Sequence, residues 1–500
     1  MLAALGACTL VGPNYQLPKG AVAQRGDAAA PFIGSAEKLF RSEPLPADWW
    51  RLYQDATLDA LIAKAFAANT DLRVAVANLE RTHGVLEEVE EQKKPEVEMS
   101  ASPSYGRLAG AALARPDTLP NFGFYSADIK VGYEVDFVGK VRRAIEAAEA
   151  DIEAAEAAVD LTHVMVAADT TRAYVDACAA GHEIHVAEHL IELQQKFVEL
   201  TAQRVRLGRG TALDNARALS QLESVRATLP PFEARRRDAL YRLAVLTGEV
   251  PANFPAAVAK CTAPPRVTTT IPVGDGAALL RRRPDIRQTE RVLAAATARI
   301  GVATAELYPS INFGLTAGSI GTLTDIGASN TFHFNIGPLI SWTLPATSTA
   351  RSHIAQTTAL SRQSLARFDA TVLNALRETE TALTNYAREL DRNAALKAAF
   401  DHSKLASEQA ARLQRYGRSD FFTSLEAERT MANAQQALAG SDAALAANQV
   451  ALFRALGGGW ENTHAAHGGH GAASGHGEQK APVVHTGRKE HKAGDGAHHQ

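Results

Sequence analysis

Residues 139–207 read GKVRRAIEAAEADIEAAEAAVDLTHVMVAADTTRAYVDACAAGHEIHVAEHLIELQQKFVELTAQRVRL, with no proline in 69 positions. From Ile145 onward, small or apolar residues recur at alternating steps of three and four, which is the heptad pattern of a helix packed along a seam. These residues are Ile145, Ala148, Ile152, Ala155, Val159, Thr162 and Val166. A continuous helix of this length would span roughly 100 Å, so it extends beyond a single compact domain.

The same pattern returns in residues 350–416. It is carried there by Ser361, Leu365, Phe368, Val372, Ala375, Thr379, Ala382 and Tyr386. Each copy ends in a glycine turn, at Gly208 and Gly417, and a second helical stretch follows each turn. Pro230 and Pro231 are expected to interrupt the first of these returning helices. The sequence therefore predicts an internal duplication of one helical unit.

Each copy also predicts two strands next to its long helix. A helix from about Thr57 to Lys94 is expected to end before Pro95, and a helix in the second copy before Pro309. Apolar and polar residues then alternate with a period of two, as in strands with one apolar face. The strands are expected within residues 97–105, 128–137, 311–317 and 332–342.

Four such strands leave two open edges. Alternation over about ten residues fits a membrane barrel, but four strands cannot close one, and unpaired backbone groups are not tolerated in hydrocarbon. From alternation alone, two soluble hairpins capping a helical bundle remain an equal alternative. The long helices favour the barrel, because they also lack a core unless other chains supply one, and oligomerisation satisfies both needs.

Composition excludes several classes of function. The net charge of -3 gives no basic field for nucleic acid, and no run of eighteen apolar residues predicts a transmembrane helix. Motifs for phosphate binding, zinc binding or nucleophilic catalysis are absent from the sequence, so no enzyme activity and no cofactor are expected. The three cysteines form no CxxC pair: Cys178 is expected to be an inert packed thiol, and Cys261 lies in a loop with no assigned role.

Several longer motifs carry a resemblance. They are VGPNYQLP (11–18), DWWRLYQDATLDALI (48–62), YEVDFVGKVRRAIEAAEAD (133–151) and LLRRRPDIRQTERVLAAATARIGVATAELYPSI (279–311). Together they resemble the NodT-type outer-membrane lipoproteins of the TolC-like outer-membrane factor family of tripartite efflux systems. The counterpart of the third motif, SWTLPATSTARSHIA (341–355), departs from the family pattern at 346–348. The RRRPDIR segment by itself is best explained as a helix start with an arginine salt-bridge cluster, since Pro284 and Asp285 both suit a first helical turn.

The resemblance implies a mainly α-helical fold with a membrane β-barrel. Two tandem repeats of long helices plus a β-hairpin would form a homotrimer, with a twelve-stranded barrel on an α-helical periplasmic tunnel. The implied function is the passive exit duct of a tripartite efflux pump in the Gram-negative outer membrane. The implied partners are outer-membrane lipid, a periplasmic membrane-fusion adaptor and an inner-membrane pump of the resistance-nodulation-division type. The alternative is a periplasmic coiled-coil structural or adaptor protein, which has no use for lipid-facing strands; an enzyme ranks third.

The chain divides accordingly into six expected segments. They are a truncated signal remnant (1–7), an extended lipid-anchored segment (8–56), repeat 1 (57–249), a linker (250–276), repeat 2 (277–460) and a disordered His-rich tail (461–500). The lipid is expected on Cys8, which ends the lipobox-like Leu5-Gly6-Ala7-Cys8.

Candidate functional residues lie at the two glycine turns and in the tail. In a trimer the turns would gather at the end opposite the barrel, where the duct closes. The residues proposed to narrow this periplasmic aperture are Asp214, Tyr416, Asp420, Phe422 and Glu426, and those proposed to dock the adaptor are Arg206, Arg209, Arg415 and Arg418. The tail is expected to be solvated, with loose metal binding as the alternative role of His464, His467, His470 and His476. No fixed metal site is expected.

Overall fold

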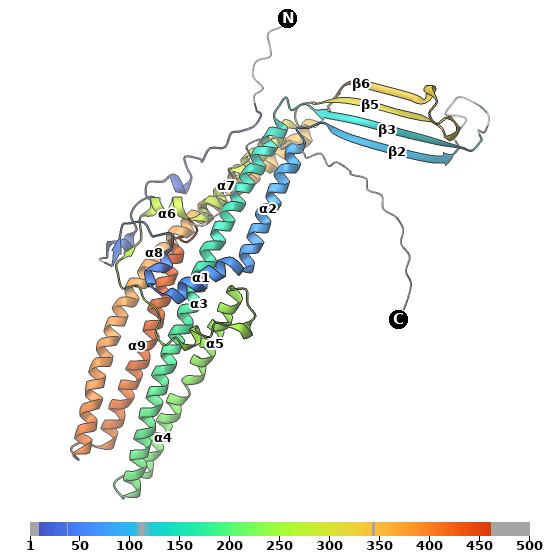
Figure 1. Cartoon of the computed structure of the whole chain (residues 1–500). Coiled ribbons are helices and arrows are strands. Elements are labelled where there is room, and N and C mark those ends of the chain that lie inside the picture. The colour runs from blue at the N-terminus through green and yellow to red at the C-terminus, as the bar shows by residue number, and fades with distance from the viewer. Residues whose placement is uncertain are drawn as a thin grey trace, which may run out of the picture. The chain divides into compact units, whose positions relative to one another are not determined.

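Two long helices run through the structure, which is a computed structural model. It describes residues 10–461 except 38, 108, 110–115, 117, 119 and 343–345. Helix α3 (Lys140–Arg206) has 67 residues and α8 (Ala346–Arg415) has 70, so both predicted long helices are confirmed (Figure 1). Among the described residues, no helix is both long enough and apolar enough to cross a bilayer.

The heptad residues form the seams of these helices. On α3, Ile145, Ala148 and Ile152 are buried, and on α8, Phe368 and Val372 have at most 1% of their surface exposed. Shorter helices cover both halves of each long helix. The first half of α3 contacts α2 (Thr70–Glu91) and α7 (Pro284–Ala305), and its second half contacts α4 (Ala212–Arg226), α5 (Leu229–Leu246) and α9 (Phe421–Ala455) (Figure 1). Helix α8 packs against α7 and then α9.

The first repeat opens with two helices rather than the single helix expected from about Thr57 to Lys94. Helix α1 (Ala56–Ala68) and α2 (Thr70–Glu91) are separated at Asn69, whose backbone is extended. The Asn69 side chain accepts hydrogen bonds from the amides of Asp71 and Leu72 and donates one to the carbonyl of Leu246. The expectation of one helix was wrong because this cap stabilises a new helix start inside a continuous helical pattern.

The returning helices differ between the repeats. In repeat 1 the return is broken into α4 (Ala212–Arg226) and α5 (Leu229–Leu246), with Pro230 and Pro231 in the first turn of α5. The predicted interruption is therefore confirmed. In repeat 2 the return is the single helix α9 (Phe421–Ala455).

Each returning helix ends beside the start of the helix that leads into the strands of its own repeat, α2 in repeat 1 and α7 in repeat 2. Helix α5 ends beside Asn69, and α9 ends beside Arg283, which precedes α7 (Pro284–Ala305) and donates to the carbonyl of Ala455. Gly248 and Gly457, which follow the two helix ends, have φ of +73° and +70°. Only glycine adopts this left-handed conformation without strain, so both helices stop in the same way.

The N-terminal segment and the linker pack onto the middle of this helical assembly. Trp49 is fully buried, stacks on Phe453 at 4.8 Å between ring centroids, and donates to the carbonyl of Gly458. The two segments pair as short parallel strands, β1 (Phe40–Arg41) and β4 (Ile271–Pro272). The linker then continues into α6 (Gly276–Arg282).

The four predicted strands form one antiparallel sheet in the order β2-β3-β5-β6. Their bounds are β2 (Glu96–Gly106), β3 (Phe122–Glu134), β5 (Ser310–Thr322) and β6 (Phe332–Ser341). Strand β3 starts and ends earlier than expected: it begins at Phe122, which pairs with Gly106, and stops before the turn at Gly139.

Candidate functional site

The sheet has one apolar and one polar face. Directly paired residues share a face, and the register aligns Met99 with Ile129, Leu315 with Ile336 and Ala317 with Phe334. The apolar face is largely exposed: its exposed side chains are Val97, Met99, Tyr105, Ile129, Tyr133, Phe313, Leu315, Phe332, Phe334, Ile336 and Ile340. An exposed apolar surface of this size indicates a lipid or protein partner.

The opposite face carries the charges. Asp128 and His333 lie on either side of Gly318 in one row of the sheet, and His333 Nε2 is 3.1 Å from the Asp128 carboxylate. Lys130 lies 3.7 Å from the Glu98 carboxylate on the neighbouring strand. This division of the sheet is the arrangement expected between lipid and water. A coiled-coil adaptor would have no use for it.

The two glycine turns have the same structure. Gly208 and Gly417 both have φ of +70°, and the residue after each glycine donates its amide back into the last helical turn. The arginines around them, Arg206 and Arg209 in one turn and Arg415 and Arg418 in the other, are exposed. In the part of the chain that the structure describes, none of these four guanidinium groups has a hydrogen-bond or ion-pair partner, so all four can bind a partner protein.

Two of the candidate aperture residues form hydrogen bonds with backbone amides of their own turns. Asp214 and Thr211 form a capping box: the Asp214 carboxylate accepts from the Thr211 amide at 2.9 Å, and this bond lowers the pKa of Asp214. Asp420 caps α9 by accepting from the Thr423 amide at 2.7 Å, and its hydrogen bonds to Thr423 lower its pKa in the same way. The T-x-x-D signature of the first cap is readable in the sequence.

The other three candidates are exposed at the same turn. Tyr416 has 77% and Phe422 55% of its surface exposed, and Glu426 is also exposed. Arg217 of α4 lies over the Phe422 ring, 5.6 Å from its centroid. The turn of repeat 2 therefore lies next to the helix that follows the turn of repeat 1.

The two helical hairpins also pack together just above their turns. Phe197 of α3 and Phe421 of α9 stack with their ring centroids 5.2 Å apart. Two turns further along α9 lies Glu428, which is largely buried. Burial raises the pKa of this carboxyl to about 7. Sequence analysis did not single it out, because most carboxylates of these helices lie on solvated faces.

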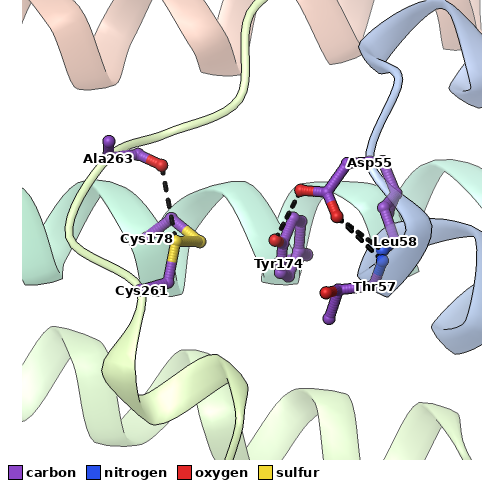
Figure 2. Close-up of a disulfide and its surroundings, with 7 residues drawn as sticks. All are labelled: Asp55, Thr57, Leu58, Tyr174, Cys178, Cys261 and Ala263. Carbon is purple, nitrogen blue, oxygen red and sulfur yellow. Dashed lines mark hydrogen bonds between the residues drawn. A yellow bond between two sulfur atoms is a disulfide. The ribbon is translucent and has the colours of Figure 1, made fainter.

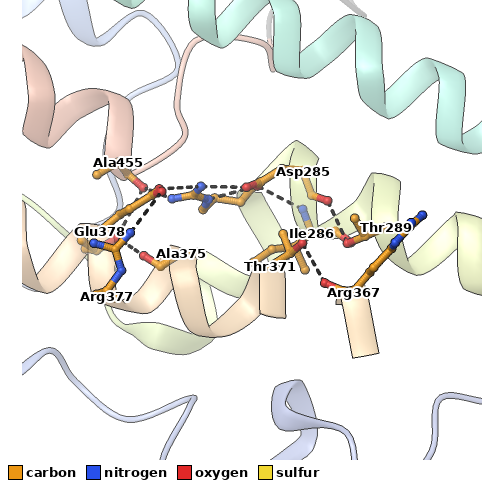
Figure 3. Close-up of polar contacts among 11 residues, drawn as sticks. Asp285, Ile286, Thr289, Arg367, Thr371, Ala375, Arg377, Glu378 and Ala455 are labelled. Atoms are coloured by element: carbon orange, nitrogen blue, oxygen red, sulfur yellow. Dashed lines mark hydrogen bonds and ion pairs between the residues drawn. The ribbon is translucent and has the colours of Figure 1, made fainter. Parts of the chain in front are cut away.

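The RRRPDIR segment forms the salt-bridge cluster that its sequence indicates. The Arg283 side chain is 11% exposed and binds both oxygens of Asp285, the first-turn acid of α7. It also donates to the Glu378 carboxylate of α8 at 3.1 Å and to the carbonyl of Ala455 at the end of α9 (Figure 3). Arg283 thus joins α7, α8 and α9, and its part in the structure is architectural.

Cys178 is not the packed thiol that was expected. It forms a disulfide with Cys261, 83 positions later, and thereby ties the linker to α3 (Figure 2). Gly181, one turn further along α3, allows this approach, because a Cβ there would lie 2.1 Å from the Cys261 carbonyl oxygen. The prediction was wrong because pairing depends on the folded linker, and the sequence spacing carries no signal for it.

The helix surface beside the disulfide also holds the N-terminal segment. Tyr174, one turn before Cys178, donates to the Asp55 carboxylate at 2.6 Å, and burial raises the pKa of its phenol (Figure 2). Asp55 in turn caps α1. One stretch of α3 therefore anchors both connecting segments of the chain.

No group of three metal-ligating side chains occurs in the described parts of the chain. Cys8 and the four tail histidines, His464, His467, His470 and His476, lie outside the described residues.

Comparisons with known proteins agree with this geometry. A family model for the outer membrane efflux protein matches residues 61–249 and 277–458. The toluene efflux pump outer membrane protein TtgC of Pseudomonas putida is 28% identical over 473 residues, covering 91% of this chain and 93% of that protein. Nodulation protein T of Rhizobium leguminosarum bv. trifolii is 26% identical, covering 87% of this chain and 91% of that protein.

A solved structure gives the same result. The outer-membrane channel OprN superposes with a TM-score of 0.82 at 32% identity, covering 90% of this chain and 99% of that chain. The expected resemblance and fold are thereby confirmed. The chain belongs to the outer membrane efflux protein family.

Proposed function

We propose that this chain forms the passive exit duct of a tripartite efflux pump, as a trimer that crosses the outer membrane and reaches into the periplasm. As a member of a channel family it is not an enzyme. The observation that carries the proposal is the four-stranded sheet with an exposed apolar face, joined directly to two long helical hairpins. Neither part is complete in one chain.

The open edges of one chain support closure by further copies. The sheet ends in β2 on one side and β6 on the other. In the half of the helical part next to the sheet, neighbouring helices follow the order α2-α3-α7-α8. In the half that leads to the glycine turns, the order is α4/α5-α3-α9-α8 (Figure 1). Since β2 follows α2 and β6 precedes α8, the same two sides of the chain stay open in the sheet, in the helices next to it and in the helices near the glycine turns. If the side of one copy that ends in β6 and α8 binds the side of the next copy that ends in β2 and α2, a rotation about one axis closes the copies into a ring.

The edges also expose apolar side chains that a neighbouring chain would cover. They are Val74 and Val85 on α2, Leu213 and Leu219 on α4, and Leu360, Leu373, Leu405 and Leu413 on α8. Three chains bring twelve strands together, which leaves no strand edge in the hydrocarbon.

The aperture of the duct is proposed at the glycine turns. Asp214 and Asp420 cap helices there, so they would fix the shape of the turns rather than face the lumen. Tyr416, Phe422 and Glu426 are the exposed members, and threefold symmetry would make each a ring. Three Glu426 carboxylates close together would bind cations and narrow the opening.

The unpartnered arginines suit a docking role. Arg206, Arg209, Arg415 and Arg418 are exposed at the same end and would attract acidic groups on a periplasmic membrane-fusion adaptor. Through that adaptor the duct would serve an inner-membrane pump of the resistance-nodulation-division type. We further propose that Cys8 is acylated, so that lipid anchors the chain in addition to its sheet.

Single-channel recording in planar bilayers tests the duct and its aperture together. Purified protein should have the native mass of a trimer and give stepwise conductance. The Phe422→Ala, Glu426→Ala double variant should conduct at least twice as well and lose most of its block by divalent cations. The control is Leu200→Ala with Glu199→Ala, which likewise removes one exposed apolar side chain and one exposed carboxylate, on α3 before the first turn.

The outcomes separate the two parts of the proposal. A monomeric mass with the strands intact, or a trimer without conductance, contradicts the duct. A conducting trimer in which the double variant and its control behave like the unmodified protein removes Phe422 and Glu426 from the aperture.

A further inference from the structure

Three sequence motifs meet at one place beside the start of α3. They are VGPNY (11–15) in the N-terminal segment, VGKVRRA (138–144) at the junction of β3 and α3, and ARIG (298–301) near the end of α7. Helix α3 belongs to the first repeat and α7 to the second, so the N-terminal segment contacts both repeats here.

Arg143 is the centre of this contact. Its side chain is 1% exposed, although the side chain of the adjacent Arg142 is 41% exposed. Arg143 Nε donates to the carbonyl of Val11 at 3.0 Å, and Nη2 donates to the carbonyl of Gly12 at 3.3 Å and to Asn14 Oδ1 at 2.7 Å. Nη1 donates to Glu146 at 2.6 Å, which balances the buried charge. The guanidinium fork thus holds Val11 and Gly12 by their carbonyls and Asn14 by its side chain, all within one short segment.

Two glycines make room for this arrangement. A Cβ on Gly12 would lie 2.5 Å from the Cα of Gly301, and a Cβ on Gly301 would lie 2.8 Å from the Arg143 stem. Gly12 also has φ of +82°, which side chains rarely tolerate. The N-terminal segment, α7 and the arginine are therefore in direct van der Waals contact, and any larger residue would separate them.

The contact continues on both sides of Arg143. Upstream, the amide of Val11 donates to the carbonyl of Val138, and Leu10 packs on Gly139. Downstream, the Tyr15 hydroxyl donates to Glu290 of α7 at 2.8 Å. Residues 10–15 are consequently fixed along their whole length.

This position coincides with the helix-side end of the apolar face of the sheet. Val138 and Gly139 follow β3, whose last residues include Tyr133. Three aromatic side chains are exposed near this end. Tyr133 lies on β3, Phe313 lies opposite it on β5, and Trp342 directly follows β6. Aromatic side chains collect at the level where lipid hydrocarbon meets the headgroups.

We propose that Arg143 is the positioning residue for the lipid anchor of this chain, a proposal that rests on the proposed acylation of Cys8. Cys8 precedes Leu10 by two residues, and two residues reach at most about 7 Å. With residues 11–14 held by Arg143, an acyl group on Cys8 enters the membrane at the aromatic end of the sheet. The anchor and both repeats then form one rigid unit, and the anchor fixes the depth of the sheet in the bilayer.

The test compares Arg143→Ala and Arg143→Lys with Arg142→Ala as the matched control, all as acylated trimers in proteoliposomes. Arg142 is the control because its bonds go to Asp136 and not to the N-terminal segment. Hydrogen–deuterium exchange of the amides in 11–15 should be at least ten-fold faster in Arg143→Ala and in Arg143→Lys, since lysine lacks the fork. In Arg142→Ala it should stay within two-fold of the unmodified protein.

A second measurement reports depth. Quenching of Trp342 by lipids brominated at different acyl positions gives the depth of the aromatic end, because the other tryptophans pack against the helical part of the chain. The depth profile should shift in both Arg143 variants and remain unchanged in Arg142→Ala. If Arg143→Ala does not fold, Gly301→Ala displaces the arginine stem and serves in its place.

The outcomes are distinct. Unchanged exchange in the Arg143 variants overturns the clamp, and faster exchange with an unchanged Trp342 profile overturns its role in positioning the anchor. Mass spectrometry of the same samples shows whether Cys8 carries lipid. An unmodified Cys8 in native membranes refutes the acylation itself and with it the anchor, while the exchange data still decide whether Arg143 holds the segment.

Discussion

Breaking the disulfide between Cys178 and Cys261 should lower the thermal stability of the assembled protein by a calculable amount. The bond closes a loop over a sequence separation of 83 residues, which includes the end of α3 and all of α4 and α5. Chain-entropy arguments give about 4.5 kcal/mol for a closed loop of this size. The unfolding entropy of a chain with roughly 450 ordered residues is about 1 kcal/mol per degree, so the midpoint should fall by about 5 °C.

The assay is thermal unfolding of the trimer at fixed protein concentration, with and without a dithiol reductant, because association also shifts the midpoint. The Cys178→Ser, Cys261→Ser double variant should unfold near the temperature of the reduced protein. The reductant should have no further effect on that variant, which makes it the control. The reasoning is refuted if alkylation and mass spectrometry show both cysteines fully reduced while the midpoint stays within 1 °C of the oxidised protein.

Two further predictions concern single side chains. Glu428 has a pKa of about 7 in the fold, raised by burial above the usual value near 4.5, so the folded protein binds the extra proton and stability should fall as pH rises from about 4.5 through 7. Glu428→Gln should abolish this pH-dependent loss of folding stability, which amounts to at most roughly 3 kcal/mol at pH 8. Unfolding midpoints of both proteins at pH 5 and pH 8 measure it. The same change in midpoint with pH in the two proteins would contradict the prediction. Asn69→Ala removes the cap of α2 and leaves the Leu246 carbonyl without its donor, at a cost of about 2 kcal/mol. Asn69→Asp keeps the cap and should lose only part of this in denaturant titrations; equal losses in both variants would assign the effect to the Leu246 contact alone.

Periodicity accounts for the features that the sequence predicted well. A heptad pattern from Ile145 to Val166, inside a stretch of 69 residues without proline, predicted a long packed helix, and strict alternation assigned each strand its two faces. Pro230 and Pro231, in the first turn of α5, also predicted the break between α4 and α5. These signals are local in the chain, and each depends on a backbone geometry that recurs regardless of tertiary context.

The remaining features depend on contacts between distant segments. Arg142 and Arg143 are adjacent and identical in type, yet one is exposed and the other buried, because the helix turns only Arg143 toward the N-terminal segment. Asn69 interrupts a helical pattern that is otherwise uniform, and its partner is at Leu246. The pairing of Cys178 with Cys261 likewise requires the folded linker. The local caps at Asp214 and Asp420, in contrast, follow from short-range signatures.

The open sides of the chain have a genetic consequence. Each copy offers two unlike sides, one ending in β6 and α8 and the other in β2, α2 and α4. In the proposed trimer, a copy damaged on one side alone still binds a normal neighbour through its intact side, yet the ring that contains it cannot close. Such alleles should therefore be dominant over the normal gene, and two alleles damaged on opposite sides should fail to complement each other, since every closed ring needs both sides of every copy.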